Sequence, residues 1–178
     1  MDLYQAALAY TARYATSKEN LRQVLWRKLR RAAFRSGEPE PPVADTEAEI
    51  ANIISRLERI GAVDDHAYAE TLLRTLTARG TSVKAIRAKL QAKGVPAALI
   101  ADLITASASA ESEYQAALRY ARRRRLGPYR QLPVTPERRQ KDLAALCRAG
   151  FAYSTAICVV DSGSDILEVP PEGSDGPA

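Results

Sequence analysis

Apolar residues recur at intervals of three and four along most of the chain, and this spacing places them on one side of an α-helix. Glycine, proline or a capping Ser, Thr or Asp interrupts the pattern at short intervals and divides it into separate helices. The aromatic content of 6% also favours helix over sheet, because strands prefer aromatic and β-branched residues. The predicted helices cover about residues 2–15, 18–34, 47–60, 66–78, 83–93, 96–104, 111–126, 136–148 and 156–160.

The same spacing predicts which side chains face inward. The predicted inner faces include Tyr10, Tyr14, Leu21, Leu25, Ile53, Ile60, Tyr68, Leu72, Val83, Leu90, Leu118 and Leu146. Residues 36–43 contain one glycine and three prolines, so they predict a loop. Asp45 and Thr46 are the expected caps of the helix that follows this loop.

Two short phrases occur twice in the chain. A Thr-Ser pair followed by apolar and basic residues begins at Thr16 and returns 65 positions later at Thr81. A second phrase, Leu-x-x-x-Gly followed by an apolar residue, begins at Leu90 and returns at Leu146, an offset of 56. Because two or three short helices cannot bury a core alone, repeated helical units are expected to stack on their neighbours.

The repeats therefore predict an all-α protein that forms an elongated, curved array of tandem three-helix repeats. The first repeat is expected at 1–62, with the Pro-rich loop 36–43, the second at 63–108 and the third at 109–162. Residues 163–178 are rich in Gly, Pro, Asp and Glu, which predicts a disordered acidic tail.

Composition narrows the class of protein. The chain is 46% hydrophobic and 26% charged, and no apolar run approaches the roughly 20 residues that cross a bilayer. The first residues lack the basic stretch and apolar core of a secretory signal. Cys147 and Cys158 have no third Cys and no neighbouring His, so we expect neither a metal site nor a disulfide framework. The cytoplasm is the expected location.

The sequence offers no catalytic set. Its one histidine, His66, follows Asp64 and Asp65 at a predicted helix start. Adjacent carboxylates on a helix point in divergent directions, so we interpret them as helix caps rather than as metal ligands. The glycines are isolated helix stops and form no phosphate-binding loop. We predict a protein that is not an enzyme and needs no cofactor.

Basic residues gather on three predicted helices, although the net charge is only +5. They are expected to contact either phosphates, without reading sequence, or the carboxylates of a protein partner. The alternative is a solvated helix surface without a partner. The candidate contact residues are Arg22, Arg27, Lys28, Arg30, Arg31, Lys84, Arg87, Lys89, Lys93, Arg122, Arg123, Arg124, Arg125, Tyr129 and Arg130.

Five short motifs follow one another along the chain: Arg-Tyr-Ala-Thr-Ser at 13–17, Gly-Ala-Val-Asp-Asp-His-Ala-Tyr-Ala at 61–69, Arg-Gly-Thr-Ser at 79–82, Lys-Gly-Val at 93–95 and Arg-Ala-Gly-Phe at 148–151. In these motifs and their order the chain resembles the RecX family, which regulates the RecA recombinase. The family usually has a second basic residue where Ala149 stands here. The motif residues of this chain are Ser17, Leu21, Asp64, Asp65, Tyr68, Gly80, Ser82, Leu90, Gly94, Gly150 and Phe151.

The resemblance implies three tandem three-helix repeats that lie in the groove of a RecA–DNA filament. There the protein would limit filament growth and suppress ATP hydrolysis, strand exchange and repressor cleavage, and so regulate recombination, DNA repair and the SOS response. The leading hypothesis is a RecA-filament modulator that binds protein first and single- or double-stranded DNA second. The alternatives are a stand-alone, sequence-nonspecific DNA-binding protein and an adaptor for another acidic protein.

Overall fold

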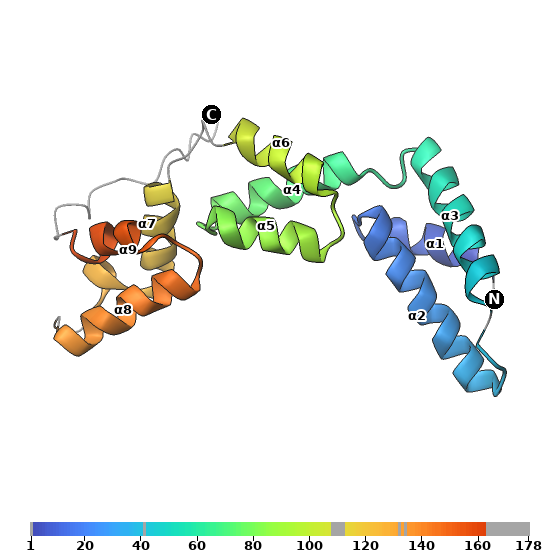
Figure 1. Cartoon of the computed structure of the whole chain (residues 1–178), viewed down its shortest axis with the longest axis horizontal. Coiled ribbons are helices and arrows are strands. Elements are labelled where there is room, and N and C mark those ends of the chain that lie inside the picture. The colour runs from blue at the N-terminus through green and yellow to red at the C-terminus, as the bar shows by residue number, and fades with distance from the viewer. Residues whose placement is uncertain (1, 41, 108–112, 132, 134, 163–178) are drawn as a thin grey trace, which may run out of the picture. The chain divides into compact units, whose positions relative to one another are not determined.

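The structure, a computed structural model, describes residues 2–40, 42–107, 113–131, 133 and 135–162. Over these residues all regular backbone is helical (Figure 1), which confirms the predicted all-α class. The elements are α1 (Leu3–Thr11), α2 (Lys18–Ser36), α3 (Val43–Arg59), α4 (Asp65–Ala78), α5 (Val83–Ala92), α6 (Ala97–Ser107), α7 (Glu113–Arg124), the short 3₁₀-helix η1 (Gly127–Tyr129), α8 (Pro136–Arg148) and α9 (Tyr153–Val160).

Three sets of consecutive helices each enclose a group of buried apolar side chains. The group of α1, α2 and α3 contains Leu3, Ala7, Leu21, Leu25, Trp26, Ile50, Ile53, Ile54, Leu57 and Val63. The group of α4, α5 and α6 contains Ala69, Leu73, Leu76, Ile86, Leu90, Val95, Ile100 and Ile104. The group of α7, α8 and α9 contains Ala116, Ala117, Leu118, Ala121, Leu143, Leu146, Phe151, Ala156 and Val159. The repeat boundaries at 62/63 and 108/109 stay predictions.

The chain divides into two compact units. Of the described elements, one unit holds α1, α2, α3, α6 and most of α4 and α5, and the other holds α7, α8, α9 and the turn 77–85. This turn lies directly against α7. A Cβ atom at Gly80 would stand 2.6 Å from the carbonyl oxygen of Ala116. Arg123 also donates from Nη1 to the carbonyl oxygen of Arg79 at 2.9 Å.

The beginning of α2 follows from its Thr-Ser phrase. The hydroxyl oxygen of Ser17 accepts a hydrogen bond from the Asn20 backbone N–H at 3.1 Å, as expected of an N-cap. At the other end α2 continues to Ser36, two residues beyond the predicted end, and Gly37 then takes the left-handed conformation with φ 71°.

The Pro-rich loop is shorter than predicted because α3 begins at Val43. Asp45 and Thr46 lie within the first turn of α3, so the prediction that they cap this helix is wrong. Thr46 instead donates its hydroxyl hydrogen to the carbonyl oxygen of Pro42 at 2.7 Å. A proline beside a helix start is tolerated because the first N–H groups have no helical partner.

The clear errors in the predicted inner faces fall at helix ends and in α4. The residues buried as predicted include Leu21, Leu25, Ile53, Leu90, Leu118 and Leu146. Tyr14 and Ile60 are exposed because α1 and α3 end before them. Val83 is exposed because it is the first residue of α5. In α4 the fully buried face is displaced by one position, so that Tyr68 and Leu72 lie half-buried at its edge.

The two repeated phrases meet each other in the structure. Ser17 donates its hydroxyl hydrogen to the carbonyl oxygen of Lys93, directly before Gly94. Ser82 donates in the same way to the carbonyl oxygen of Ala149 at 2.6 Å, directly before Gly150. Both serines are buried, and each also caps its own helix, Ser82 by accepting from the Ala85 N–H at 3.2 Å. Each Thr-Ser helix start is thus bonded to one Leu-x-x-x-Gly helix end.

Substitution of Gly94 tests how tightly the start of α2 packs against the end of α5. A Cβ atom at this position would overlap the side chain of Glu19 on α2, and the φ of 71° disfavours any L side chain. We expect Gly94→Ala to lower the free energy of unfolding by about 2–4 kcal/mol, measured by urea denaturation.

Gly37→Ala is the matched control, because it measures the cost of the left-handed backbone conformation without a steric overlap. Gly37 has the same φ of 71°, but nothing lies within 4 Å of an added Cβ atom. Its replacement is expected to cost about 1 kcal/mol. Equal losses in the two variants would contradict the close approach of α2 to the end of α5.

The predicted acidic tail, 163–178, lies outside the described residues and stays a prediction. Within the described part of the chain, none of the helices combines the length and the apolar character needed to span a bilayer.

Candidate functional site

The basic residues of α2 fall into two classes. Arg22, at the N-terminal end, is paired within the protein: its Nε lies 2.7 Å from Oε2 of Glu19 and its Nη1 lies 2.6 Å from Oε1 of Glu47 on α3. Hydrogen bonding to Glu19 raises the pKa of Arg22, and the same bond lowers the pKa of Glu19. Arg22 therefore links α2 to α3, whereas Arg27, Arg30 and Arg31 further along α2 are exposed.

Trp26 is a buried part of the same link. Its ring belongs to the α1–α3 core, and its Nε1–H donates to Oε1 of Glu47 at 2.8 Å. The guanidinium of Arg30 lies over the Trp26 ring, 5.5 Å from the centroid. Trp26 and Arg30 border a hollow of about 410 Å³, and Arg30 also borders a larger one.

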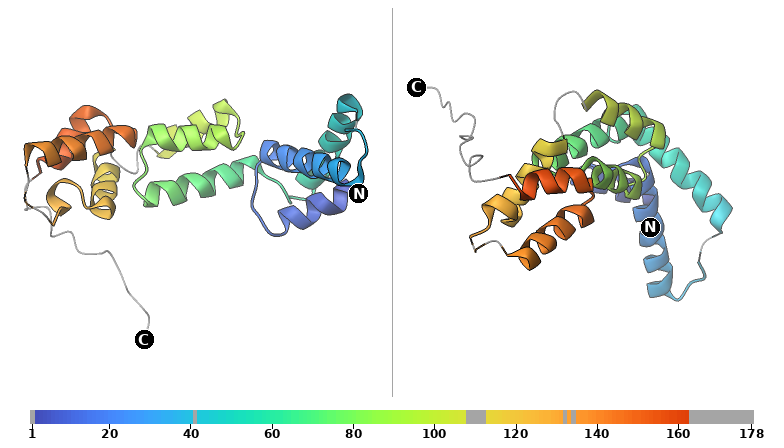
Figure 2. Two further views of the ribbon diagram at one scale, coloured as in Figure 1. Left: turned by 90° about the horizontal axis from the view of Figure 1, so that it is seen from below. Right: turned by 60° about the vertical axis from the view of Figure 1, so that its left-hand side comes forward.

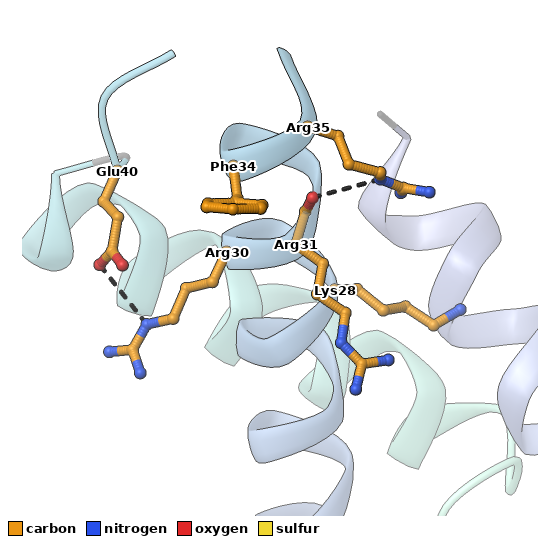
Figure 3. A pocket seen from close by; sticks show the side chains of 6 residues that line it. All are labelled: Lys28, Arg30, Arg31, Phe34, Arg35 and Glu40. Carbon is orange, nitrogen blue, oxygen red and sulfur yellow. Dashed lines mark hydrogen bonds and ion pairs between the residues drawn. The ribbon is translucent and has the colours of Figure 1, made fainter. Parts of the chain in front are cut away.

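The larger hollow, of about 660 Å³, lies at the C-terminal end of α2 (Figure 3). Phe34 stands in it with 88% of its surface exposed. We call this set the α2 basic–aromatic surface, and it consists of Lys28, Arg30, Arg31, Phe34, Arg35 and Glu40.

Three members of this surface, Phe34, Arg35 and Glu40, are absent from the sequence-based candidates. A signal for Phe34 was available, because at 100° per residue position 34 lies on the side of α2 opposite Leu21 and Leu25. An aromatic residue opposite the buried stripe has no core to join. Counting charged residues alone misses such a residue.

The basic residues of α5 lie as predicted on its outer side. Ile86 and Leu90 face the core, and the basic side chains between and beyond them are exposed. These exposed side chains are Lys84, Arg87, Lys89 and Lys93.

The arginines that end α7 are exposed, but two are ordered by contacts within the protein. Arg123 caps the end of α4 through Arg79, and the guanidinium groups of Arg123 and Arg124 lie 5.6 and 6.0 Å from the Tyr120 ring centroid. Arg125 has a φ of 54°, the left-handed conformation that glycines adopt after α3, α5 and α8. Of the four arginines, Arg123 is held by a hydrogen bond to the backbone, and the exposed Arg122, Arg124 and Arg125 are the candidates for an outside partner.

Arg130 and Tyr129, two further candidate contact residues, are both partly buried. Arg130 donates from Nε to Oδ2 of Asp142 at 3.0 Å, and its Nη2 pairs with Oδ1 of the same carboxylate. This hydrogen bonding raises the pKa of Arg130. Tyr129 lies in η1 and packs partly buried against the α7–α9 core. Arg130 thus ties the turn after α7 to α8.

The acidic motif before α4 is a pair of caps, as predicted, but the two carboxylates cap different helices. Oδ1 of Asp64 accepts from the backbone N–H groups of His66 and Ala67 at 2.8 and 3.1 Å, at the start of α4. Oδ1 of Asp65 accepts from the backbone N–H of Lys18 at 2.8 Å, at the start of α2. In the described residues no cluster of His, Cys, Asp or Glu has an arrangement that could hold a metal ion.

Lys18 adds a third polar contact at the start of α2. Its Nζ lies 2.5 Å from Oε1 of Glu58 near the end of α3. The hydrogen bond that Lys18 donates to Glu58 raises the pKa of Lys18. Together with the cap from Asp65, this contact fixes the start of α2 between the end of α3 and the start of α4.

The sequence of the chain is similar to those of known proteins of one family. A regulatory protein RecX of Myxococcus xanthus is 42% identical over 162 residues, which cover 90% of this chain and 84% of that protein. The chain belongs to the RecX family. Residues 64–104 match the family description "RecX, second three-helix domain". A regulatory protein RecX of Agrobacterium fabrum is 34% identical over 63% of this chain and 61% of its own.

Solved RecX structures share the fold. The crystal structure of RecX from Lactobacillus salivarius has a TM-score of 0.63 at 20% identity and covers 93% of this chain and 96% of its own. A second structure, described as regulatory protein RecX, has a TM-score of 0.60 at 23% identity over 89% of this chain and 70% of its own. At these identities the agreement concerns the fold alone.

Proposed function

We propose that this chain is a non-catalytic modulator of RecA that binds the RecA–DNA filament and inhibits its activity in recombination, DNA repair and the SOS response. Membership of the RecX family of regulatory proteins, through the 42% identical relative, is the observation that carries the proposal. The protein would act in the cytoplasm without a cofactor, and its three helix sets would serve as tandem repeats along the filament.

The distribution of charge supports a partner of this kind. Exposed basic side chains occur on α2, α5 and α7, in each of the three helix sets. A nucleoprotein filament presents both phosphates and carboxylates, and arginine pairs with either through two parallel hydrogen bonds. We therefore infer protein contacts first and sequence-nonspecific contacts to single- or double-stranded DNA second.

The DNA-dependent ATPase of RecA tests this function. We expect the unchanged chain to suppress ATP hydrolysis at a stoichiometry that coats the filament. The triple variant Arg122→Glu, Arg124→Glu, Arg125→Glu should need about tenfold more protein for half-inhibition, since each reversal replaces attraction by repulsion. Arg123 is left in place because it caps α4 through Arg79.

The matched control reverses three exposed arginines outside the candidate surfaces, Arg13, Arg59 and Arg74, with the same change in net charge. This control should inhibit as the unchanged chain does. Loss of inhibition in both variants would mean that net charge alone matters. No inhibition by the unchanged chain would remove the proposed function.

A stand-alone DNA-binding protein is the second candidate. The exposed Phe34 ring among cations favours it, because this chemistry suits nucleic acid without help from RecA. DNA binding that is steeply salt-dependent and unaccompanied by any effect on RecA would support this alternative.

A further inference from the structure

Phe34 is the most exposed of the large apolar side chains in the described part of the chain. The fold does not use it, since α2 packs through its other side. In Figure 1 and in the right-hand view of Figure 2 the last turns of α2 reach beyond α1 and α3. The Phe34 ring therefore has open faces on a rigid helix.

The side chains that line the hollow together with Phe34 are nearly all cationic. Lys28, Arg30, Arg31 and Arg35 line the same hollow as Phe34 (Figure 3). Arg35 is positioned by its own helix, because its Nε donates to the carbonyl oxygen of Arg31 at 3.2 Å. An aromatic anchor in a protein interface is usually ringed by neutral contacts that exclude water. A ring among four cations instead fits a flexible polyanion that carries aromatic rings of its own.

We propose that the α2 basic–aromatic surface binds single-stranded nucleic acid, with a base stacked on Phe34 and the adjoining phosphates on Lys28, Arg30 and Arg31. Single strands are the fitting class because a duplex keeps its base faces stacked inside, whereas an unpaired strand offers them. The inference rests on the nucleic-acid contact within the proposed function and adds its location and its strand preference.

Glu40 is an internal competitor for the same cations. Its Oε2 lies 3.5 Å from Nε of Arg30, and both side chains are more than half exposed. An exposed pair of this kind contributes little stability, so an incoming phosphate can displace the carboxylate. Removal of the carboxylate should therefore strengthen binding.

Fluorescence anisotropy of the full chain with a labelled oligo(dT) strand, without RecA, tests the inference. We expect Phe34→Ala to weaken binding about tenfold and Phe34→Trp to retain it, because stacking needs only a π-face. Glu40→Gln should tighten binding about twofold. Arg30→Gln with Arg31→Gln should reduce the slope of log affinity against log salt by about 1.4, the value for two phosphates on a single strand.

Two controls separate stacking from charge and from general exposure. An abasic strand of the same length keeps the phosphates and lacks the bases, so Phe34→Ala should not change its affinity. Tyr153→Ala removes another exposed aromatic side chain, 62% exposed on α9, and should not change oligo(dT) binding.

Trp26, the one tryptophan of the chain, supplies a second readout because it borders the neighbouring hollow with Arg30. Unlabelled oligo(dT) is expected to quench its emission, and Phe34→Ala to shift the half-quenching concentration about tenfold.

Unchanged oligo(dT) affinity in Phe34→Ala, or an equal loss with the abasic strand, would overturn the stacking site. If Phe34→Ala binds oligo(dT) normally but no longer inhibits the RecA ATPase, the surface contacts protein instead. If Phe34→Ala loses oligo(dT) binding, the inference stands, whether or not this variant still inhibits the RecA ATPase. Failure of the unchanged chain to inhibit RecA bears on the proposed function alone.

Discussion

Leu90→Asp is expected to unfold α4, α5 and α6 under conditions in which the unchanged chain is folded. Leu90 has 0% of its surface exposed and lies in the buried group of these helices. The substitution removes a packed leucine and places a carboxylate where no described side chain of that group can pair with it. We expect a loss of about 4 kcal/mol or more in the free energy of unfolding.

Two optical signals separate the local effect from the global one. Far-UV circular dichroism follows all the helices, whereas Trp26, the one tryptophan, reports on the α1–α3 group. Leu90→Asp should lower the helical signal while a cooperative Trp26 transition remains. Gln91→Asp introduces the same residue at the next, exposed position and should leave both signals nearly unchanged. Similar behaviour of the two variants would contradict the burial of Leu90.

Asp142→Ala is expected to destabilise the α7–α9 group by about 3 kcal/mol, the second-largest effect. Asp142 is 3% exposed, accepts from the Gly127 N–H at 2.9 Å and pairs with Arg130. Its removal leaves a buried N–H without its partner and a largely covered guanidinium without its counter-charge. Such losses exceed the net value of the pair itself.

A second ion pair that involves α8 provides the control. Arg139 bonds Asp161 through two hydrogen bonds of 2.7 and 2.6 Å, but both side chains are about 40% exposed. Asp161→Ala should therefore have a much smaller effect on the urea midpoint, because solvent and salt screen an exposed pair. Equal effects would show that burial of Asp142 is not what makes its pair important. The double variant Asp142→Ala, Arg130→Ala should lose less stability than the sum of the single variants.

Exposed arginines and internally paired arginines differ in their value as mutational probes of partner binding. Arg22 and Arg130 each hold two helical segments together through carboxylates. Their replacement would disturb the fold as well as any contact, so they are poor probes of binding. Better probes are the exposed residues Arg122 and Arg124 of α7 and Arg30, Arg31 and Phe34 of α2.

The order and approximate bounds of the helices followed from the sequence alone. Local signals decide them: Ser17 and Thr135 cap α2 and α8, and the bounds of α8, Pro136–Arg148, agree with the prediction. Where the prediction failed, the apolar pattern ran past the end of α1, as at Tyr14, or began with the exposed first residue of α5, Val83. Periodicity shows which face is apolar but does not show where backbone hydrogen bonding stops.

Only the tertiary structure decided which groups pair over long sequence separations. The sequence contains two repeated phrases, yet nothing local shows that the Ser of one bonds the helix end of the other, as Ser17 and Lys93 do. The same holds for Asp65, which caps α2 rather than its own helix. Phe34 differs, since its place opposite the buried stripe of α2 follows from the sequence, and the structure adds that its side chain is left exposed. Helix formation depends on neighbours three and four residues away, whereas burial and pairing depend on which helices the folded chain brings together.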